Sequence, residues 1–441
     1  MIRWLVYISI VILTFGTRKL LGHITPGFDE YESFFLYLSD LVLLLLVFGN
    51  FKFLILNFKS IFKFSNISIA GFLVIAFISV FSAFSAPLAL YSFARLLLVI
   101  LAAVSTAILI QKEFLKTEWI FGGIAIAAVI QSVIALGQFI FQKSLGLIWL
   151  GEPVVGPTIG GASKIVVEGF RILRAYGTFP HPNILAAFLL LGLISLCYFW
   201  LKRPIVAGKD GILSDLKFGL PIFAVSLGLV MAFSRAAWLV GGFILAVFLL
   251  KAIFSRENFR QGIRLAIFLV AISILLIFSF GQYIFPRAAV SVSEPSVTQR
   301  ISYNQLAFEL IKSRPLGVGV GNQVLYAVKN EVYQRFGMNE VWQWQPIHNI
   351  YLLIASEVGV LGLLAILIFL GRLLIFNFKF SIFKKAPMTN DQLLITTTML
   401  SALLLLGLFD HFLWTLQPGR IMLWLVIALV LANKKPGRLT G

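Results

Sequence analysis

Long apolar runs separated by short charged segments recur along the whole chain. Most approach the roughly 20 residues that an α-helix needs to cross a bilayer, and none alternates as a transmembrane β-strand would. The pattern predicts an all-α polytopic membrane protein, one integral-membrane domain over residues 1–441, with about twelve transmembrane helices. We place them near 3–16, 33–49, 67–86, 88–110, 119–141, 182–201, 217–233, 235–253, 264–285, 348–371, 393–411 and 414–432.

The first apolar run, residues 4–15 behind Arg3, has the character of a signal-peptide core. The following Gly16-Thr17-Arg18-Lys19 offers no small-x-small cleavage site, so we predict a retained first helix.

Lysine and arginine mark the cytoplasmic side of a membrane protein. With both termini inside, the predicted inner segments hold 21 of the 36 basic residues, and the net charge of +18 is mainly an orientation signal. This arrangement predicts a multi-pass membrane protein with both termini cytoplasmic and two long outer loops, 142–181 and 286–347. The second loop lies between spans nine and ten.

Both outer loops contain features that indicate order. In the first, 164–167 and 170–173 flank Glu168-Gly169, which predicts a short hairpin. In the second, Tyr303, Leu306, Ala307, Leu310 and Ile311 fall on one helical face, and Pro315 closes the segment. We therefore predict a helix lying on the membrane surface.

Ionisable residues inside spans are costly and indicate functional positions. Asp40, Arg95 and Glu357 lie in the outer halves of their predicted spans, and Asp410 and Arg420 flank the last outer turn. One interpretation is a buried ion bridge, such as Asp40 with Arg95. The other is a polar cavity open to the outer face. A secondary transporter also needs polar groups near the midplane and on the inner side, and this sequence lacks that pattern.

Basic side chains gather near the outer ends of the predicted spans. Arginine binds phosphate through a fixed fork of donors, so this set suits a lipid-linked phosphate; anchoring of some arginines at headgroups is the alternative. The residues are Arg171, Arg174, His181, Arg235, Arg287, Arg300, Arg314 and His348.

Composition narrows the chemistry. The chain is 60% hydrophobic and 12% charged, and it offers no basic, aromatic-interleaved soluble domain for nucleic acid. The glycine-rich segment 317–322 lacks the lysine of a phosphate-binding Walker loop. No cluster of carboxylates or histidines has metal-ligand spacing. An enzyme here is expected to use neither ATP nor a metal or other cofactor, and to draw on an activated donor.

Four motifs over residues 174–362 resemble the O-antigen ligase and O-antigen polymerase (Wzy) family. They are Arg174-Ala-Tyr-Gly177-Thr-Phe-Pro-His181-Pro-Asn183; Phe233-Ser234-Arg235-Ala-Ala; Arg300 followed by Arg314-Pro-Leu-Gly-Val-Gly-Val-Gly-Asn322; and His348-Asn349-Ile-Tyr351-Leu-Leu with Glu357-Val-Gly-Val-Leu-Gly362.

The resemblance implies a GT-C-like, metal-independent, inverting glycosyltransferase of cell-envelope polysaccharide or lipopolysaccharide biosynthesis. It implies transfer of a glycan from undecaprenyl pyrophosphate to a glycan, lipid or protein acceptor on the outer face of the cytoplasmic (inner) membrane. By resemblance Arg235 and Arg300 hold the pyrophosphate, His348 is essential, and Arg174 is a further phosphate or sugar contact. Arg314, His181, Asn183 and Asn349 complete the expected substrate-binding set.

Physical chemistry supports the role of His348. Transfer builds negative charge on the leaving oxygen, which guanidinium groups stabilise, and imidazole can take the acceptor proton near neutral pH. The alternative is an interfacial histidine beside Asn349, a helix N-cap. Glu357 lies about 180° around the helix from His348, so we expect it to pair with another helix. Trp342 and Trp344 suit either sugar stacking or the interfacial aromatic belt.

Three alternatives to an O-antigen ligase stay open. A polymerase of the same family shares every feature used here. A flippase for lipid-linked saccharides would bind the pyrophosphate through the same arginines but needs a polar inner entry, which the sequence lacks. A structural partner in an envelope assembly is the third alternative.

Overall fold

The computed structural model describes residues 2–25, 30–52, 54–56, 66–204, 208–289, 294–383 and 390–432. The basic residues within 57–65, 384–389 and 433–441, which contributed to the predicted orientation, lie outside the described residues.

Each of the twelve predicted spans overlaps a helix. Seven helices among the described residues are long and apolar enough to cross a membrane: α5 (Ala86–Gln111), α6 (Thr117–Phe141), α7 (Pro182–Lys202), α8 (Gly208–Met231), α9 (Arg235–Ile253), α10 (Phe259–Ala288) and α14 (Ile350–Phe383). The other five are shorter: α1 (Ile2–Ile12), α2 (Leu38–Gly49), α4 (Asn66–Phe81), α15 (Asn390–Leu406) and α17 (Gln417–Ala432). The fold is therefore that of a mostly helical polytopic membrane protein.

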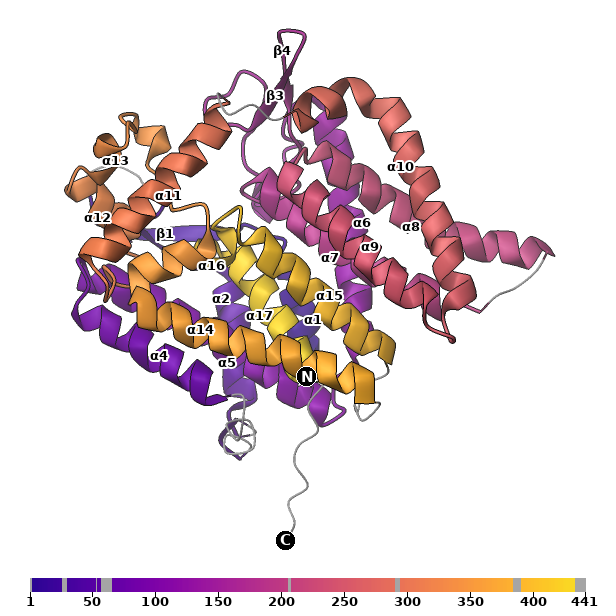
Figure 1. Cartoon of the computed structure of the whole chain (residues 1–441), viewed down its shortest axis with the longest axis horizontal. Coiled ribbons are helices and arrows are strands. Elements are labelled where there is room, and N and C mark those ends of the chain that lie inside the picture. Colours follow the sequence, from indigo (N-terminus) through magenta and orange to yellow (C-terminus); the bar gives the residue numbers. More distant parts are fainter. Residues whose placement is uncertain are drawn as a thin grey trace.

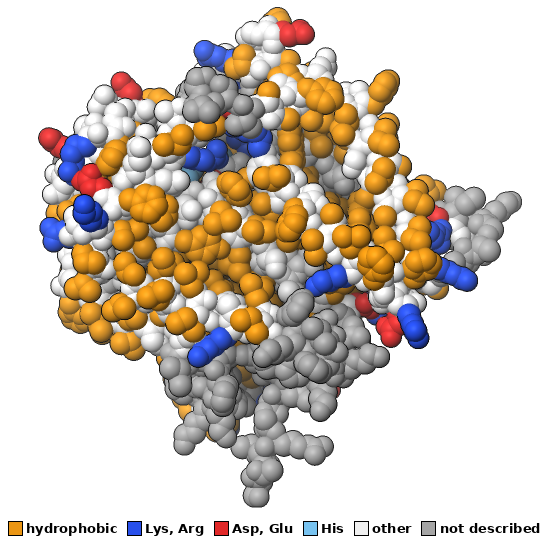
Figure 2. Space-filling model, in the orientation of Figure 1, with side chains coloured by type: hydrophobic (Ala, Val, Ile, Leu, Met, Phe, Trp, Pro, Cys, Tyr) orange, Lys and Arg blue, Asp and Glu red, His pale blue; other side chains and the backbone are white. Residues whose placement is uncertain are grey.

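Helix α7 lies at the centre of the bundle. Its side chains are apolar on all sides and nearly all buried, as expected of a helix enclosed by other helices. It packs against α6, α8, α9 and α15, while α5 packs on α17 and α4 on α14. A band of hydrophobic side chains crosses the middle of the molecule (Figure 2).

Polar elements collect at one end of the bundle, which we call the hairpin end (Figure 1). It carries the strand pairs β1 (Arg18–His23) with β2 (Ser33–Tyr37) and β3 (Lys164–Val167) with β4 (Phe170–Leu173). Among the loops lie α11 (Pro295–Ser313), of 19 residues, and the short helices η1 (Ile148–Leu150), α12 (Gln323–Lys329), α13 (Val332–Arg335), η2 (Val341–Gln343) and α16 (Phe412–Thr415). The predicted hairpin at 164–173 and the predicted helix around 303–311 are both present.

The prediction of a helix from residue 33 was wrong. Residues 33–37 form β2, whose side chains alternate between more and less buried positions as it pairs with β1. Asp40 ends the strand and begins α2, because its carboxylate accepts the Tyr37 backbone N–H at 3.0 Å. The helix is therefore only 12 residues long.

A break in α14 receives the glycine-rich loop. At Gly359 the backbone has φ 85°, outside the helical region. The N–H groups of Val318 and Gly319 bond to the carbonyls of Ser356 and Glu357, each at 2.9 Å. The glycine-rich loop 317–322 therefore has a structural role, because its backbone pairs with the carbonyls that the break in α14 leaves open.

We expect Gly177→Ala to destabilise the protein by about 1–3 kcal/mol. Gly177 has φ +60°, and an added Cβ would lie 2.3 Å from the Gln131 side-chain oxygen. That oxygen accepts the Thr178 backbone N–H at 3.0 Å, so the clash falls on the loop that carries Arg174. Thermal unfolding in detergent should show the loss. Gly160→Ala, at a site with open space, is the control; equal melting temperatures for the two variants would contradict this account.

Candidate functional site

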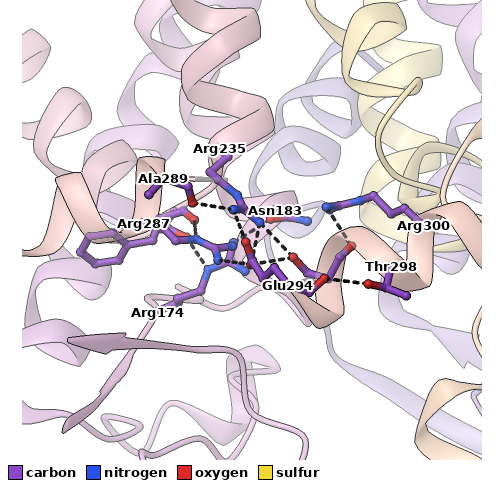
Figure 3. A network of polar contacts seen from close by, with 11 residues as sticks. Arg174, Asn183, Arg235, Arg287, Ala289, Glu294, Thr298 and Arg300 are labelled. Carbon is purple, nitrogen blue, oxygen red and sulfur yellow. Dashed lines mark hydrogen bonds and ion pairs between the residues drawn. The ribbon is translucent and has the colours of Figure 1, made fainter. Parts of the chain in front are cut away.

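Four arginines from distant parts of the chain meet at the hairpin end (Figure 3). Arg174 follows β4, Arg235 is the first residue of α9, Arg287 lies near the end of α10, and Arg300 lies in α11. We call these four residues the arginine cluster.

Glu294 is the carboxylate at the centre of the arginine cluster. Arg235 donates to its two oxygens at 2.5 and 2.8 Å, and Arg287 donates at 3.4 Å. The Ser296 hydroxyl lies 2.9 Å from Arg235, and the Ser296 carbonyl accepts from Arg300 at 3.4 Å. Partial burial opposes ionisation of Glu294, but the hydrogen bonds from Arg235 and Ser296 hold its pKa below the usual value.

The arginine cluster has more positive charge than its carboxylate neutralises. Burial lowers the pKa of Arg174 to about 9, with Arg287 adding repulsion, so Arg174 stays charged at neutral pH. The Nε of Arg300 is buried and has no hydrogen-bond partner among the described residues. Cations partly withdrawn from water and incompletely paired favour an incoming anion.

Three histidines surround Asp410 next to the arginine cluster; we call His181, His348 and His411 the histidine cluster. The rings of His348 and His411 lie 4.8 Å apart in an edge-to-face arrangement, and His411 Nε2 lies 4.0 Å from an Asp410 oxygen. Burial lowers the pKa of His181 and of His411 to about 3 each. Burial opposes ionisation of Asp410, yet the histidines and an Asn183 hydrogen bond hold its pKa well below the usual range.

The surroundings of His348 fix its tautomer. Its Nδ1 lies 2.9 Å from the Pro346 carbonyl oxygen, which can only accept, so Nδ1 carries the proton and Nε2 keeps a lone pair. The Tyr303 ring stacks on the imidazole at 4.8 Å with a 4° interplanar angle. Burial lowers the pKa of His348. The charge of Asp410 raises this pKa, and the charge of Arg300 lowers it. The imidazole is thus held neutral, oriented and basic at one nitrogen.

Asn183 joins the arginine cluster to the histidine cluster. Its side-chain oxygen accepts from Arg174 at 2.7 Å, and its side-chain nitrogen donates to Asp410 at 2.6 Å. His181 caps α7 by accepting the Asn183 backbone N–H at 3.2 Å. The 174–183 motif therefore positions three polar side chains at once.

We expect Asn183→Ala to lower the turnover number by about tenfold or more, because Arg174 and Asp410 lose the amide that hydrogen-bonds to both. The measurement is the rate of the glycan transfer that the sequence resemblance implies, at a saturating concentration of the lipid-linked donor. Asn330→Ala, which removes an exposed amide bonded only within α12 and its end, serves as the control. A full turnover number in Asn183→Ala would contradict the bridging role.

The structure does not bring every candidate residue into this site. Arg314 is exposed beyond the far end of α11, 14 residues from Arg300 or roughly 20 Å along a helix, and its Nε lies 3.4 Å from the Tyr326 hydroxyl. Asn349 caps α14 by accepting the Tyr351 N–H at 3.0 Å. Both residues lie outside the two clusters.

The intramembrane charges form separate contacts. Asp40 and Arg95 are 3.9 Å apart, and Gln417 hydrogen-bonds to both, as the ion-bridge interpretation predicts. Glu357 accepts from the Trp414 indole at 2.7 Å and from the Gly321 N–H at 2.8 Å. It contacts another helix, α16, as expected, and does not orient His348.

Sequence reasoning missed Glu294 and His411 as members of the site. Both are close in the sequence to residues that did attract notice: Glu294 comes seven positions after Arg287, and His411 directly follows Asp410. The sequence did contain a signal for each. Glu294 is a carboxylate among arginines, and His411 is a histidine beside the aspartate Asp410.

The fold and this site define a class: a polytopic helical membrane protein with an anion-attracting arginine cluster beside a neutral imidazole. Residues 220–367 match the protein-family model of O-antigen ligase, which confirms the resemblance over that segment and supports a function of the O-antigen ligase or polymerase type. The matched segment contains Arg235, Arg300 and His348; Arg174, His181 and Asn183 precede it. No curated protein matches the chain.

Proposed function

We propose that this protein is a membrane glycosyltransferase of the O-antigen ligase type. It moves a glycan from undecaprenyl pyrophosphate to an acceptor hydroxyl at the outer face of the cytoplasmic membrane. The observation that carries the proposal is that Asn183 joins the arginine cluster to Asp410, beside an imidazole whose Nε2 keeps its lone pair.

The arginine cluster binds the pyrophosphate of the donor. Arg235 and Arg287 already hold a carboxylate, whose oxygens occupy the position that a phosphate group would take. Arg174 and Arg300 extend the positive surface on either side. Guanidinium forks match phosphate oxygens in pairs, and their fixed positive charge stabilises the oxygen on which negative charge builds during transfer.

His348 acts as general base. The acceptor oxygen attacks the anomeric carbon while its proton passes to Nε2, and the bond from that carbon to the phosphate oxygen breaks. The electron pair of that bond leaves with undecaprenyl pyrophosphate. Attack opposite to the leaving group inverts the anomeric centre. The imidazolium that forms donates Nδ1–H to Pro346, and Asp410 nearby favours its charge.

Reconstitution tests the proposal. The purified chain in proteoliposomes receives an undecaprenyl-pyrophosphate-linked repeat unit and, separately, lipid A–core or the free repeat oligosaccharide. We expect glycan transfer in the presence of a metal chelator, with inverted anomeric configuration in the product by NMR. Translocation of the donor without transfer would show a flippase instead. Transfer to the oligosaccharide alone would identify a polymerase.

A further inference from the structure

A polar cavity borders the histidine cluster. It has a volume of about 50 Å³ and lies between the β1–β2 hairpin, α5, the glycine-rich loop, α16 and α17. Three of its lining residues contact the histidines: Tyr31 packs on the His411 ring at 5.8 Å, Thr415 bonds to His411 Nδ1 at 2.7 Å, and Pro346 accepts from His348.

The charges of this cavity are balanced, unlike those of the arginine cluster. Arg95 faces Asp40 at 3.9 Å, and Glu30 at the rim pairs with Arg18. The remaining two charged lining residues, Arg420 and Glu357, are of opposite sign. An anion gains little in such a cavity, whereas a neutral group with several hydroxyls can hydrogen-bond to its walls without adding charge.

The cavity is lined by side chains that form hydrogen bonds. Arg95 is nine-tenths buried and donates to the Tyr91 hydroxyl at 2.9 Å and to Gln417. Ser92 and Tyr91 add hydroxyls to the walls, and Trp414 adds an aromatic surface. A volume near 50 Å³ holds a few waters or the hydroxyl-bearing edge of one pyranose. A sugar hydroxyl that displaces a water and makes the same hydrogen bonds retains the favourable energy of those bonds.

From this geometry we infer that the cavity is the acceptor-sugar subsite: it binds the hydroxyl-bearing edge of a neutral pyranose next to the histidine cluster. The inference rests on the proposed function and deepens it. The donor phosphate lies at the arginine cluster and the acceptor sugar in the cavity of balanced charge. The half-exposed Glu30 and Tyr31 form the rim through which the rest of the acceptor passes.

Cysteine accessibility tests the subsite without any turnover. The one cysteine of the chain, Cys197, is fully buried, so labelling reports on an introduced thiol. Ser92→Cys places a thiol on the cavity wall, and Val324→Cys does so from α12 if the first variant fails to fold. Thr298→Cys, exposed beside the arginine cluster (Figure 3), is the donor-side control. A small methanethiosulfonate reagent is the label.

Millimolar glucose, galactose or N-acetylglucosamine should slow the labelling of Ser92→Cys severalfold and leave Thr298→Cys unchanged. Undecaprenyl pyrophosphate should do the reverse. Protection of Ser92→Cys by undecaprenyl pyrophosphate alone would assign the cavity to the donor and overturn the inference. Protection by none of these molecules would also overturn it, as would a thiol that never reacts, because a cavity closed to the reagent is closed to a sugar.

These outcomes separate the two proposals. A chain that transfers glycan but shows no sugar protection retains the proposed function and loses the subsite. A chain that shows sugar protection but never transfers glycan retains a sugar site and loses the proposed function.

Discussion

Arg235→Ala should reduce glycan transfer by about 10²–10³-fold, the effect of removing one fixed donor from a developing negative charge. Arg235 makes the closest contacts in the arginine cluster, with both oxygens of Glu294. Its loss lowers the net charge of the four arginines and Glu294 from +3 to +2 and leaves Glu294 paired with Arg287. The measurement is the initial rate of transfer in proteoliposomes, together with binding of undecaprenyl pyrophosphate.

Arg235→Lys separates charge from geometry. A lysine keeps the positive charge but lacks the planar fork, so we expect a loss between those of wild type and Arg235→Ala. Arg171→Ala is the matched control, because Arg171 is an exposed arginine on β4 outside the cluster. Equal losses in Arg171→Ala and Arg235→Ala would show that total surface charge matters and that the cluster does not.

His348→Ala should reduce transfer by about 10²–10⁴-fold, the contribution of a positioned general base, while binding of undecaprenyl pyrophosphate stays near normal. His348 contacts Pro346 and Tyr303 and none of the four arginines within hydrogen-bonding distance. His23→Ala, on the exposed strand β1, is the matched control and should leave the rate unchanged. A His348→Ala variant that transfers glycan at the normal rate but binds the donor poorly would show that His348 belongs to the donor-binding site.

The pH–rate profile tests the same role through the pKa of His348. A general base works in its neutral form, which is present above its pKa. Because burial lowers that pKa from the ordinary value of about 6.5, the rate should be level through neutral pH and fall only in more acidic solution. That acidic limb should disappear from the residual activity of His348→Ala. A rate that already falls between pH 8 and pH 7 would contradict a neutral, buried imidazole.

The positions of the helices followed from the sequence. Each apolar run must satisfy its own backbone hydrogen bonds in lipid, and only a helix does so locally. Short-range signals also gave the 164–173 hairpin and α11, because turn residues and helical periodicity act within a few positions. The β1–β2 pair was missed, since Ser33–Tyr37 reads as the start of an apolar span until its pairing with Arg18–His23 is known.

The candidate site was only partly available from the sequence. Arg174, Arg235, Arg300 and His348 attracted notice because they are basic residues near the outer ends of predicted spans, and because the motifs around them resemble one family. Arg314 belongs to the same motif, yet it lies beyond the far end of α11 from Arg300. Residues of one sequence motif therefore need not lie close together in the structure.

What the sequence by itself determined is therefore a chain of membrane helices with ordered polar loops and a set of chemically suitable side chains. Only the tertiary structure decided which of them meet: Arg174, Arg235, Arg287 and Arg300 come from four separate elements to surround Glu294, and Asn183 connects them to Asp410 and the three histidines. Local propensity acts over a few residues, whereas these contacts depend on how whole helices pack against one another. Packing therefore decided the composition of the site.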